Sequence, residues 1–187
     1  WIDVGRVFHF CTLGLTDEPI LMTTQKAVAY AREKRKMITF DPNLRPPLWK
    51  SLEEAREQIL WGLSRADVVK ISDDEVEFLW GITDETEAAG KLLNEYGVRL
   101  AMITLGPKGA YLANRNGGAR AVCPPVKPID TTGAGDIFGG SAVARLLKTG
   151  KEPDCLTVEE LAAIAAFAST AASLSTQVTG GIPSIPS

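Results

Sequence analysis

Short apolar segments alternate with longer amphipathic segments along this chain, and that alternation restricts the fold more than any other feature. The apolar segments predict strands at residues 6–13, 37–40, 67–71 and 100–105. Strands that alternate with helices form a mostly parallel sheet with helices packed on its faces. The sequence therefore predicts an α/β fold, and we expect its strands to be buried on both faces.

The amphipathic segments predict helices, and several of them carry start or stop signals. The predicted helices are residues 23–36, 52–63, 73–80, 85–96, 137–148 and 158–174. Capping-box spacing, in which a capping side chain precedes a glutamate by three positions, occurs at Ser51/Glu54, Asp84/Glu87 and Thr157/Glu160. Gly97 suits a left-handed helix end after residue 96.

Residues 100–130 have a different pattern. Apolar runs at 100–105, 110–113 and 119–122, with a tight turn predicted at Asn116-Gly117-Gly118, indicate a small antiparallel addition to the sheet. Residues 126–129 are also strand-like, and the proline-rich segments 42–47 and 124–128 predict fixed loops. No repeat, low-complexity tract or long linker interrupts the chain, so residues 1–187 are predicted to form a single domain.

Composition excludes several classes of protein. The 187 residues are 45% hydrophobic, and a domain of this size buries about 70% of the surface of its unfolded chain, which excludes disorder. With 23 acidic and 20 basic side chains the net charge is -3. No general excess of positive charge therefore attracts nucleic acid or anionic lipid. The most apolar stretch, residues 161–174, contains hydroxyl side chains and predicts a core helix rather than a membrane span.

The few cysteines and the one histidine also limit the chemistry. The cysteines, Cys11, Cys123 and Cys155, are odd in number and far apart, which fits neither a disulfide framework nor a zinc site. A reducing, cytoplasmic setting is the expectation. His9 lies in an apolar run and is predicted to be a core or strand-edge residue rather than a catalytic one.

The segment DTTGAGD at residues 130–136 places small residues at the start of a predicted helix. The first N–H groups of a helix have no partner within it, and the helix dipole adds about half a positive charge there. Gly133, Ala134 and Gly135 are therefore suited to hold a phosphate or a developing negative charge. Asp136 follows in the first turn, where its carboxylate is suited to accept a proton from an attacking hydroxyl. An ordinary glycine turn with an aspartate cap explains the composition of this segment equally well.

Two further loops follow predicted strands. Asp41, Asn43 and Arg45 lie in the DPNLRPP loop at a strand's carboxyl end, where open α/β sheets bind ligands, although turn chemistry also explains them. Residues 104–109, TLGPKG, form a glycine turn through which the backbone could approach a nucleotide, or a plain hairpin turn. No G-x-x-x-x-G-K-[ST] motif occurs, so a P-loop NTPase is unsupported.

Together these segments resemble the carboxyl-terminal part of the PfkB (ribokinase-like) carbohydrate kinases, with most similarity to the fructokinase branch. DTTGAGD matches the second signature of that family. FDPNLRPPLW at 40–49, VVKISDDEVEFLWG at 68–81, ITLGPKGAYL at 103–112 and TGGIPSIPS at 179–187 follow in the family's order and spacing. The resemblance implies a three-layer α/β/α ribokinase-like fold with a mostly parallel central sheet and a small antiparallel addition.

The resemblance also implies a role for each matching residue. Asp136 corresponds to the base that deprotonates the sugar hydroxyl, and Gly133, Ala134 and Gly135 correspond to the anion hole. The other implied roles are substrate and phosphate contacts from Asp41, Asn43 and Arg45, nucleotide contacts from Ser72, Thr104, Gly106, Gly109 and Ser169, a water-mediated Mg²⁺ contact from Glu75, and a monovalent-cation site at Asp130 and Thr132 with carbonyls of residues 175–181. The implied cofactors are ATP as phosphate donor, Mg²⁺ and K⁺.

Some of these positions depart from the family pattern. The Asn-x-x-Glu motif of the family reads Ser72-Asp73-Asp74-Glu75 here, so Glu75 alone is retained, and Ser72 with Glu75 also fits a capping box. Ser169 falls where a polar side chain approaches the adenine, but a mid-helix serine is as often a packing residue. The family's first strands, β-sheet lid and Gly-Gly sugar motif are absent from these 187 residues. We therefore expect an exposed sheet edge at residues 6–13 and little or no activity from this segment alone.

We predict an ATP-dependent kinase that phosphorylates a hydroxyl of a small sugar, with fructose as the first choice. A 2-keto-3-deoxygluconate kinase is the main alternative, because Arg45 could meet a substrate carboxylate as readily as a phosphate. A nucleoside kinase is a further enzymatic alternative, and a noncatalytic kinase-like binding protein is the alternative from another class. The predicted partners are a small-molecule sugar and ATP, with no nucleic acid and no membrane, and a homodimer through the lid region is left open.

Overall fold

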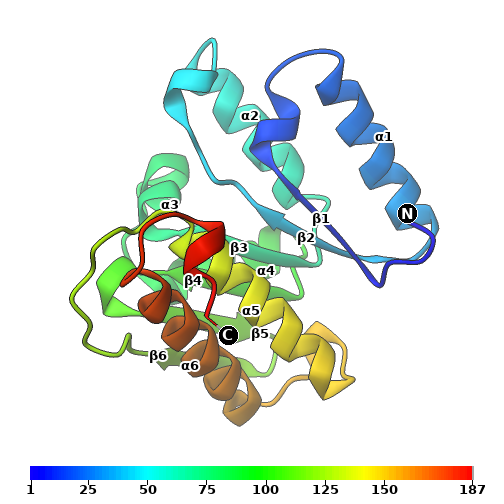
Figure 1. Ribbon diagram of the computed structural model, residues 1–187. Coiled ribbons are helices and arrows are strands. Elements are labelled where there is room, and N and C mark those ends of the chain that lie inside the picture. The colour runs from blue at the N-terminus through cyan, green and yellow to red at the C-terminus, as the bar shows by residue number, and fades with distance from the viewer. Residues whose placement is uncertain (187) are drawn as a thin grey trace. The chain divides into compact units, whose positions relative to one another are not determined.

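A computed structural model describes residues 1–186 of the chain. The chain divides into two compact units, Trp1–Ala101 and Met102–Ser187 (Figure 1). Strand neighbours follow the order of the sequence, β1-β2-β3-β4 in the first unit and β4-β5-β6 in the second. The single domain predicted over residues 1–187 stays a prediction.

The first unit alternates strands and helices, as the apolar pattern predicts. Its elements are β1 (Val7–Cys11), α1 (Ile20–Glu33), β2 (Met37–Asp41), α2 (Leu52–Leu63), β3 (Val68–Ser72), α3 (Asp73–Trp80), α4 (Glu85–Glu95) and the start of β4 (Leu100–Thr104). The pairs β1/β2 and β2/β3 are parallel, with Phe10 opposite Phe40 and Phe40 opposite Val69. The predicted α/β order is therefore confirmed in this unit.

An aromatic cluster joins the helices to the sheet in the first unit. The rings of Phe10 and Phe40 lie 4.6 Å apart between centroids, and Trp61 of α2 meets Phe10 at 6.1 Å. A Cβ at Gly62 would lie 2.4 Å from Phe40 Cζ, so α2 can pack this closely on β2 only because residue 62 is glycine. This packing sets how closely α2 approaches β2, and β2 leads directly into the DPNLRPP loop.

Two sequence-based predictions for the first unit need correction. The helix predicted at 23–36 runs from Ile20 to Glu33. β2, β3 and β4 are largely buried, as predicted, but β1 is not buried on both faces, because it is the edge strand with β2 as its strand neighbour. The exposed edge expected near residues 6–13 is therefore present, and His9 hydrogen-bonds there through Nδ1 to Thr39 Oγ1 at 2.9 Å.

The second unit combines a hairpin with a pair of long helices. Its elements are the end of β4, β5 (Ala110–Asn114), β6 (Gly117–Ala121), α5 (Ala134–Thr149) and α6 (Val158–Ser175). β5 and β6 pair antiparallel, which confirms the predicted addition to the sheet. α5 and α6 lie side by side, and α6 also packs against β5 and β6 (Figure 1).

The sequence-based boundaries are less accurate in the second unit. The hairpin turn lies at residues 115–116, because Gly117 and Gly118 already pair with Asn114 and Ala113 as part of β6. Residues 126–129 form no strand, and their backbone instead meets the end of α6, where Ile129 N–H donates to Thr176 O at 2.7 Å. The helix predicted to begin near Ile137 begins at Ala134. The whole glycine segment is therefore part of the helix start.

Local capping signals are accurate in both units. The Thr157/Glu160 pair forms a reciprocal capping box, and Ser51 and Asp84 accept the expected backbone N–H groups. Gly97 has a φ of 70° beyond α4. Cys11, Cys123 and Cys155 are free thiols.

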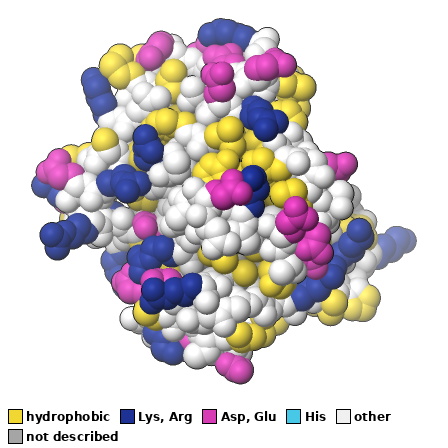
Figure 2. Space-filling model, turned by 180° about the vertical axis from the view of Figure 1, so that it is seen from behind, with side chains coloured by type: hydrophobic (Ala, Val, Ile, Leu, Met, Phe, Trp, Pro, Cys, Tyr) yellow, Lys and Arg dark blue, Asp and Glu magenta, His cyan; other side chains and the backbone are white. Residues whose placement is uncertain are grey.

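The most apolar helix, α6, is packed within its own unit. Among the described helices it is the one with the length and mean hydropathy, 1.2, of a candidate membrane span, and 39% of that window is buried. Its buried residues include Leu161, Ile164, Ala165 and Ala168. The face of the molecule in Figure 2 has acidic and basic side chains interspersed, without a patch of one sign.

Candidate active site

A buried ion pair lies at the carboxyl end of β2. Asp41, the last residue of that strand, is 5% exposed. Lys70 of β3 meets both of its carboxylate oxygens, with Nζ 3.1 Å from Oδ1 and 3.0 Å from Oδ2. The strand register explains the contact, because Phe40 pairs with Val69 and the next residues on the two parallel strands are Asp41 and Lys70.

Lys70 is a residue that sequence reasoning missed. It interrupts the apolar run Val68–Ser72 and is 8% exposed. A lysine is almost never buried without a partner. A lysine within a strand predicted to be buried was therefore the available signal that an acidic residue lies on a neighbouring strand.

The DPNLRPP loop is held from several sides. Asn43 N–H donates to Asp41 Oδ1 at 3.1 Å, and Asn43 has a left-handed φ of 46°. The hydroxyl of Thr12 donates to the Pro42 carbonyl. Leu44 N–H donates to Glu75 Oε1 at 2.8 Å, which ties the loop to the start of α3. Asp41, Asn43 and Glu75 are thus brought together by this loop.

Glu75 also completes the capping box at the start of α3. Ser72 Oγ accepts the N–H of Glu75 at 3.2 Å, and Glu75 Oε2 accepts the N–H of Ser72 at 2.9 Å. The capping box predicted for Ser72 and Glu75 is therefore confirmed. The nucleotide role of Ser72 and the Mg²⁺ role of Glu75 stay predictions.

Arg45 follows the tied part of the loop and is exposed. Its Nη1 lies 3.4 Å from the carbonyl oxygen of its neighbour Leu44, and it forms no ion pair with any residue in the described part of the chain. A guanidinium with most of its donors unused can pair with phosphoryl or carboxylate oxygens.

The predicted nucleotide turn lies at the end of β4 in the second unit. Leu105 N–H donates to Gly109 O at 2.8 Å and closes a short turn over Gly106–Lys108. Gly106 has a φ of 54° and Gly109 a φ of 102°. A Cβ at Gly109 would lie 1.9 Å from Ala121 O, so this turn lies directly against β6 and tolerates no side chain at that position.

The DTTGAGD segment forms the start of α5. Gly133 is the N-cap with a φ of 78°, and Asp136 lies in the first turn. A Cβ at Gly133 would approach Gly181 Cα to 3.2 Å, so a glycine lets these two backbone segments meet. Among residues 1–186, the N–H groups of Gly135 and Asp136 donate to no protein acceptor, whereas Ala134 N–H donates to Thr131 O. Within the described part of the chain these two N–H groups are therefore unused, in the same helical turn as Asp136.

Asp130 ties this helix start to the chain beyond α6. Its Oδ1 accepts Thr132 N–H at 2.9 Å, and its Oδ2 accepts Gly180 N–H at 2.8 Å. Hydrogen bonds from Gly180 N–H, and then from the hydroxyl and the N–H of Thr132, hold the pKa of Asp130 below its usual value. The segments at Asp130–Thr132 and Gly180–Gly181 are therefore held together by one carboxylate.

This lowered pKa predicts how the tie responds to acid. A carboxylate whose pKa is lower in the folded chain stabilises the fold above the unfolded-state pKa, about 4, and that stabilisation disappears as the pH falls through the folded-state pKa. The stability difference between the natural chain and Asp130→Asn should therefore be constant near neutral pH and shrink below about pH 4. Urea unfolding of both chains from about pH 7 to about pH 3 measures it, with Asp74→Asn as the control. A difference that persists unchanged at the lowest pH would contradict the role of the carboxylate.

Ser169 lies inside the second unit. It is 1% exposed, and its Oγ has no hydrogen-bond partner within residues 1–186. The contact with an adenine predicted for it stays a prediction. A buried hydroxyl without a partner is uncommon, and a ligand atom is one way in which it could be satisfied.

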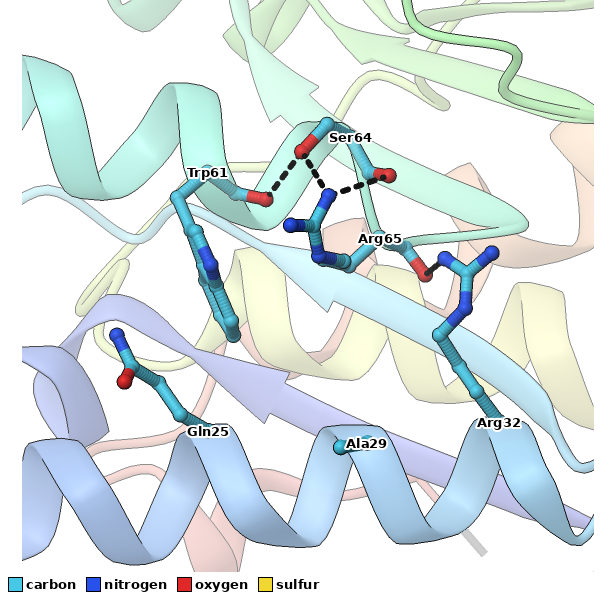
Figure 3. A pocket seen from close by; sticks show the side chains of 6 residues that line it. All are labelled: Gln25, Ala29, Arg32, Trp61, Ser64 and Arg65. Atoms are coloured by element: carbon cyan, nitrogen blue, oxygen red, sulfur yellow. Dashed lines mark hydrogen bonds between the residues drawn. The ribbon is translucent and has the colours of Figure 1, made fainter.

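One cavity of about 410 Å³ lies away from all the predicted residues, between α1 and α2 of the first unit (Figure 3). It is lined by Gln25, Ala29, Arg32, Trp61, Ser64 and Arg65. Arg32 Nη1 donates to Arg65 O at 3.1 Å, and Arg65 Nη1 donates to Ser64 Oγ at 3.0 Å. These guanidinium groups thus bind acceptors just beyond the carboxyl end of α2, where cations are favoured.

The described residues contain no group of three or more His, Cys, Asp or Glu side chains that could hold a metal ion. Glu75 does not fit direct Mg²⁺ coordination, because both of its oxygens already accept backbone N–H groups and the residue is 8% exposed. Both oxygens of Asp130 likewise accept backbone N–H groups, from Thr132 and Gly180, and the monovalent-cation role of Asp130 and Thr132 stays a prediction.

The strand-helix order, the glycine turn after β4 and the acidic first turn of α5 are the features that the sequence resemblance led us to expect. The whole chain, residues 1–187, matches the pfkB family carbohydrate kinases, and it belongs to that family. The fold is correspondingly ribokinase-like.

Individual relatives agree with this assignment. "Fructokinase-1" of Zea mays is 36% identical over 186 residues, which cover 99% of this chain and 57% of that protein. A double mutant of fructokinase from Vibrio cholerae O395, in its fructose, ADP and potassium ion bound form, has a TM-score of 0.87 at 31% identity, covering 97% of this chain and 57% of that one. Aminoimidazole riboside kinase from Salmonella enterica, complexed with aminoimidazole riboside and an ATP analog, has a TM-score of 0.82 at 29% identity over 96% of this chain and 59% of that one. The chain thus spans little more than half the length of these relatives.

Proposed function

We propose that this protein is an ATP-dependent sugar kinase and that fructose is its acceptor. The observation that carries the proposal is the start of α5, where the N–H groups of Gly135 and Asp136 donate to no acceptor among residues 1–186 and Asp136 is exposed. Membership of the pfkB family and the fructokinases among its relatives support the choice of reaction and acceptor.

Asp136 is the proposed base of this reaction. Its carboxylate would take the proton of the acceptor hydroxyl as that oxygen attacks the γ-phosphorus of ATP, and the bond from phosphorus to the ADP oxygen would break. The proton leaves Asp136 for solvent after the transfer. Because Asp136 is exposed, its carboxylate can pass this proton on to water.

The first turn of α5 is the proposed anion hole. Neither Gly133 nor Gly135 carries a side chain, and the oxygens of the transferring group would approach the N–H donors of Gly135 and Asp136. Ala134 belongs to the same turn, although its own N–H already donates to Thr131. Donors fixed in this way stabilise charge that develops during the transfer without having to reorganise.

The DPNLRPP loop is the proposed acceptor and phosphate side. Arg45 would pair its planar donors with phosphoryl oxygens, and Asn43 would contact the sugar. Asp41, which pairs with Lys70, would contact the substrate from the start of the loop. On the donor side, the turn of Thr104, Gly106 and Gly109 would meet the nucleotide, together with Ser72 and Ser169.

Two cations are proposed. K⁺ would bind near Asp130 and Thr132 with carbonyls of residues 175–181, and when bound it would add positive charge close to the start of α5. The Vibrio cholerae relative with a potassium ion supports this. Mg²⁺ would bind chiefly to the ATP phosphates and keep its waters, as is usual for this ion.

A second candidate acceptor has support of its own. The Salmonella enterica relative binds aminoimidazole riboside, and its similarity to this chain approaches that of the fructokinase. A 2-keto-3-deoxygluconate kinase also stays open, with Arg45 on the substrate carboxylate. The cytoplasmic setting and the homodimer through a lid stay predictions.

A coupled assay of ADP release tests the proposal on protein expressed from its complete coding sequence. ATP, Mg²⁺ and K⁺ are supplied with fructose, 2-keto-3-deoxygluconate, aminoimidazole riboside, ribose or adenosine. Turnover with fructose far above that with the others is the expected result. Preference for the riboside or the keto acid would replace the acceptor, and ATP binding without turnover on any sugar would favour a noncatalytic binding protein.

A further inference from the structure

Glu75 makes more contacts than a helix cap requires. A capping box uses one carboxylate oxygen to accept the N–H of the capping residue, and Oε2 does this for Ser72 at 2.9 Å. Oε1 instead accepts the N–H of Leu44 at 2.8 Å, from a loop 31 residues earlier in the chain. The same carboxylate therefore belongs to the start of α3 and to the loop that carries Arg45.

That loop has few ways of holding itself in place. Pro42, Pro46 and Pro47 have no backbone N–H, so three donors remain between residues 42 and 47. Asn43 N–H is held by Asp41 and Leu44 N–H by Glu75, and a 3₁₀ turn, Pro46–Leu48, begins immediately after Arg45. The bond to Glu75 is the last side-chain tie before Arg45.

The start of α3 holds the Glu75 carboxylate in place. Glu75 is fixed by the reciprocal bond with Ser72, and Ser72 is both the last residue of β3 and the cap of α3. Lys70, also of β3, holds Asp41 at the beginning of the loop. The loop is thus anchored at its first residue, Asp41, and at its middle residue, Leu44, to β3 and the start of α3.

We propose that Glu75 is a positioning residue for Arg45, and that it serves the acceptor side of the reaction. By holding the Leu44 N–H it sets where the next residue, Arg45, leaves the loop. The kinetic part of this proposal rests on the proposed kinase function, whereas the structural part does not.

Hydrogen exchange tests the structural part without substrate, nucleotide or Mg²⁺. Glu75→Ala removes both acceptors, and the amide of Leu44 should then exchange about 10- to 100-fold faster, because a bond to a charged acceptor is lost. Peptides within residues 42–47 report few amides, so the change is easily assigned. Asp74→Ala is the matched control: it removes an exposed carboxylate from the same helical turn, one that accepts no hydrogen bond in the described part of the chain.

Steady-state kinetics test the functional part on the protein from its complete coding sequence. In Glu75→Ala the acceptor concentration at half-saturation should rise by about tenfold or more, since small misplacements of a binding group cost that much. The Mg²⁺ concentration at half-saturation should stay within about twofold. Glu75→Gln, which keeps the shape and one acceptor oxygen, should give a smaller shift in the same direction and replaces Glu75→Ala if that chain does not fold.

Unchanged exchange at residues 42–47 would overturn the proposal, whether or not the protein is a kinase. Faster exchange together with a raised Mg²⁺ requirement and unaltered acceptor saturation would overturn the acceptor-side role and return Glu75 to the metal. If no sugar is phosphorylated, the exchange result still decides whether Glu75 holds the loop. Failure of the proposed function and failure of this inference are thus distinguishable.

Discussion

Asp136→Asn should lower turnover by about 10²- to 10⁴-fold, the usual contribution of a positioned general base. Asparagine has nearly the same shape as aspartate and still allows the helix start at Gly133, so the backbone donors of α5 should remain in place. Its amide cannot accept the proton of the acceptor hydroxyl. ATP binding, measured by calorimetry, should therefore change by no more than about twofold, because the loss falls on the transition state.

The matched control for this variant is Glu159→Gln. Glu159 is an acidic residue in the first turn of α6, so its replacement removes one charge from a comparable helix position outside the proposed site. Its turnover should equal that of the natural protein. Near-normal turnover in Asp136→Asn would refute the assignment of the base, even if the protein proves to be a sugar kinase.

Lys70→Met should destabilise the first unit by about 3–5 kcal/mol, the usual cost of removing one partner of a buried ion pair. The side chains of Lys70 and Asp41 are 10% and 8% exposed, so Asp41 would keep a largely buried charge without the Lys70 ammonium group. Methionine fills a volume close to that of the lysine stem, and cavity formation should therefore contribute little. Urea unfolding followed by tryptophan fluorescence measures the change, because Trp61 lies in the adjoining aromatic cluster.

A double variant separates the charge effect from packing. Lys70→Met combined with Asp41→Asn removes both charges, and it should recover a substantial part of the lost stability. Lys91→Met is the surface control, since Lys91 pairs with Glu95 in α4 where the side chains are 25% and 58% exposed. It should cost about 1 kcal/mol or less. Equal losses in Lys70→Met and Lys91→Met would show that the Asp41–Lys70 pair is not buried in solution.

Much of the fold was predictable because its signals are local. Ser51, Asp84 and Thr157 begin their helices as expected, since a cap needs a side chain and an N–H group only two or three residues apart. The apolar strands were predictable because burial in a parallel sheet demands continuous apolar runs. β1 is the exception, because whether a strand lies at a sheet edge depends on its neighbours and not on its own residues.

The errors arose where longer-range contacts decide the structure. Gly117 and Gly118 look like turn residues, yet they pair with β5, and a Cβ at Gly118 would lie 2.0 Å from Tyr111 Oη, so the glycine makes room for a cross-strand ring. Residues 126–129 have strand-like composition, but they bond to the end of α6 rather than to a strand. No local pattern distinguishes these outcomes.

The candidate site divides in the same way. The residue types at Gly133–Asp136 indicate anion binding from sequence alone, because an exposed helix start is a local property of a glycine-rich turn. The remaining contacts needed the tertiary structure: Lys70 on Asp41, Glu75 on Leu44 N–H, and Asp130 joining Thr132 to Gly180. Asp41 and Lys70 are 29 residues apart in the sequence, Leu44 and Glu75 are 31 apart, and Asp130 and Gly180 are 50 apart. Only strand register and helix packing decide which of these residues meet.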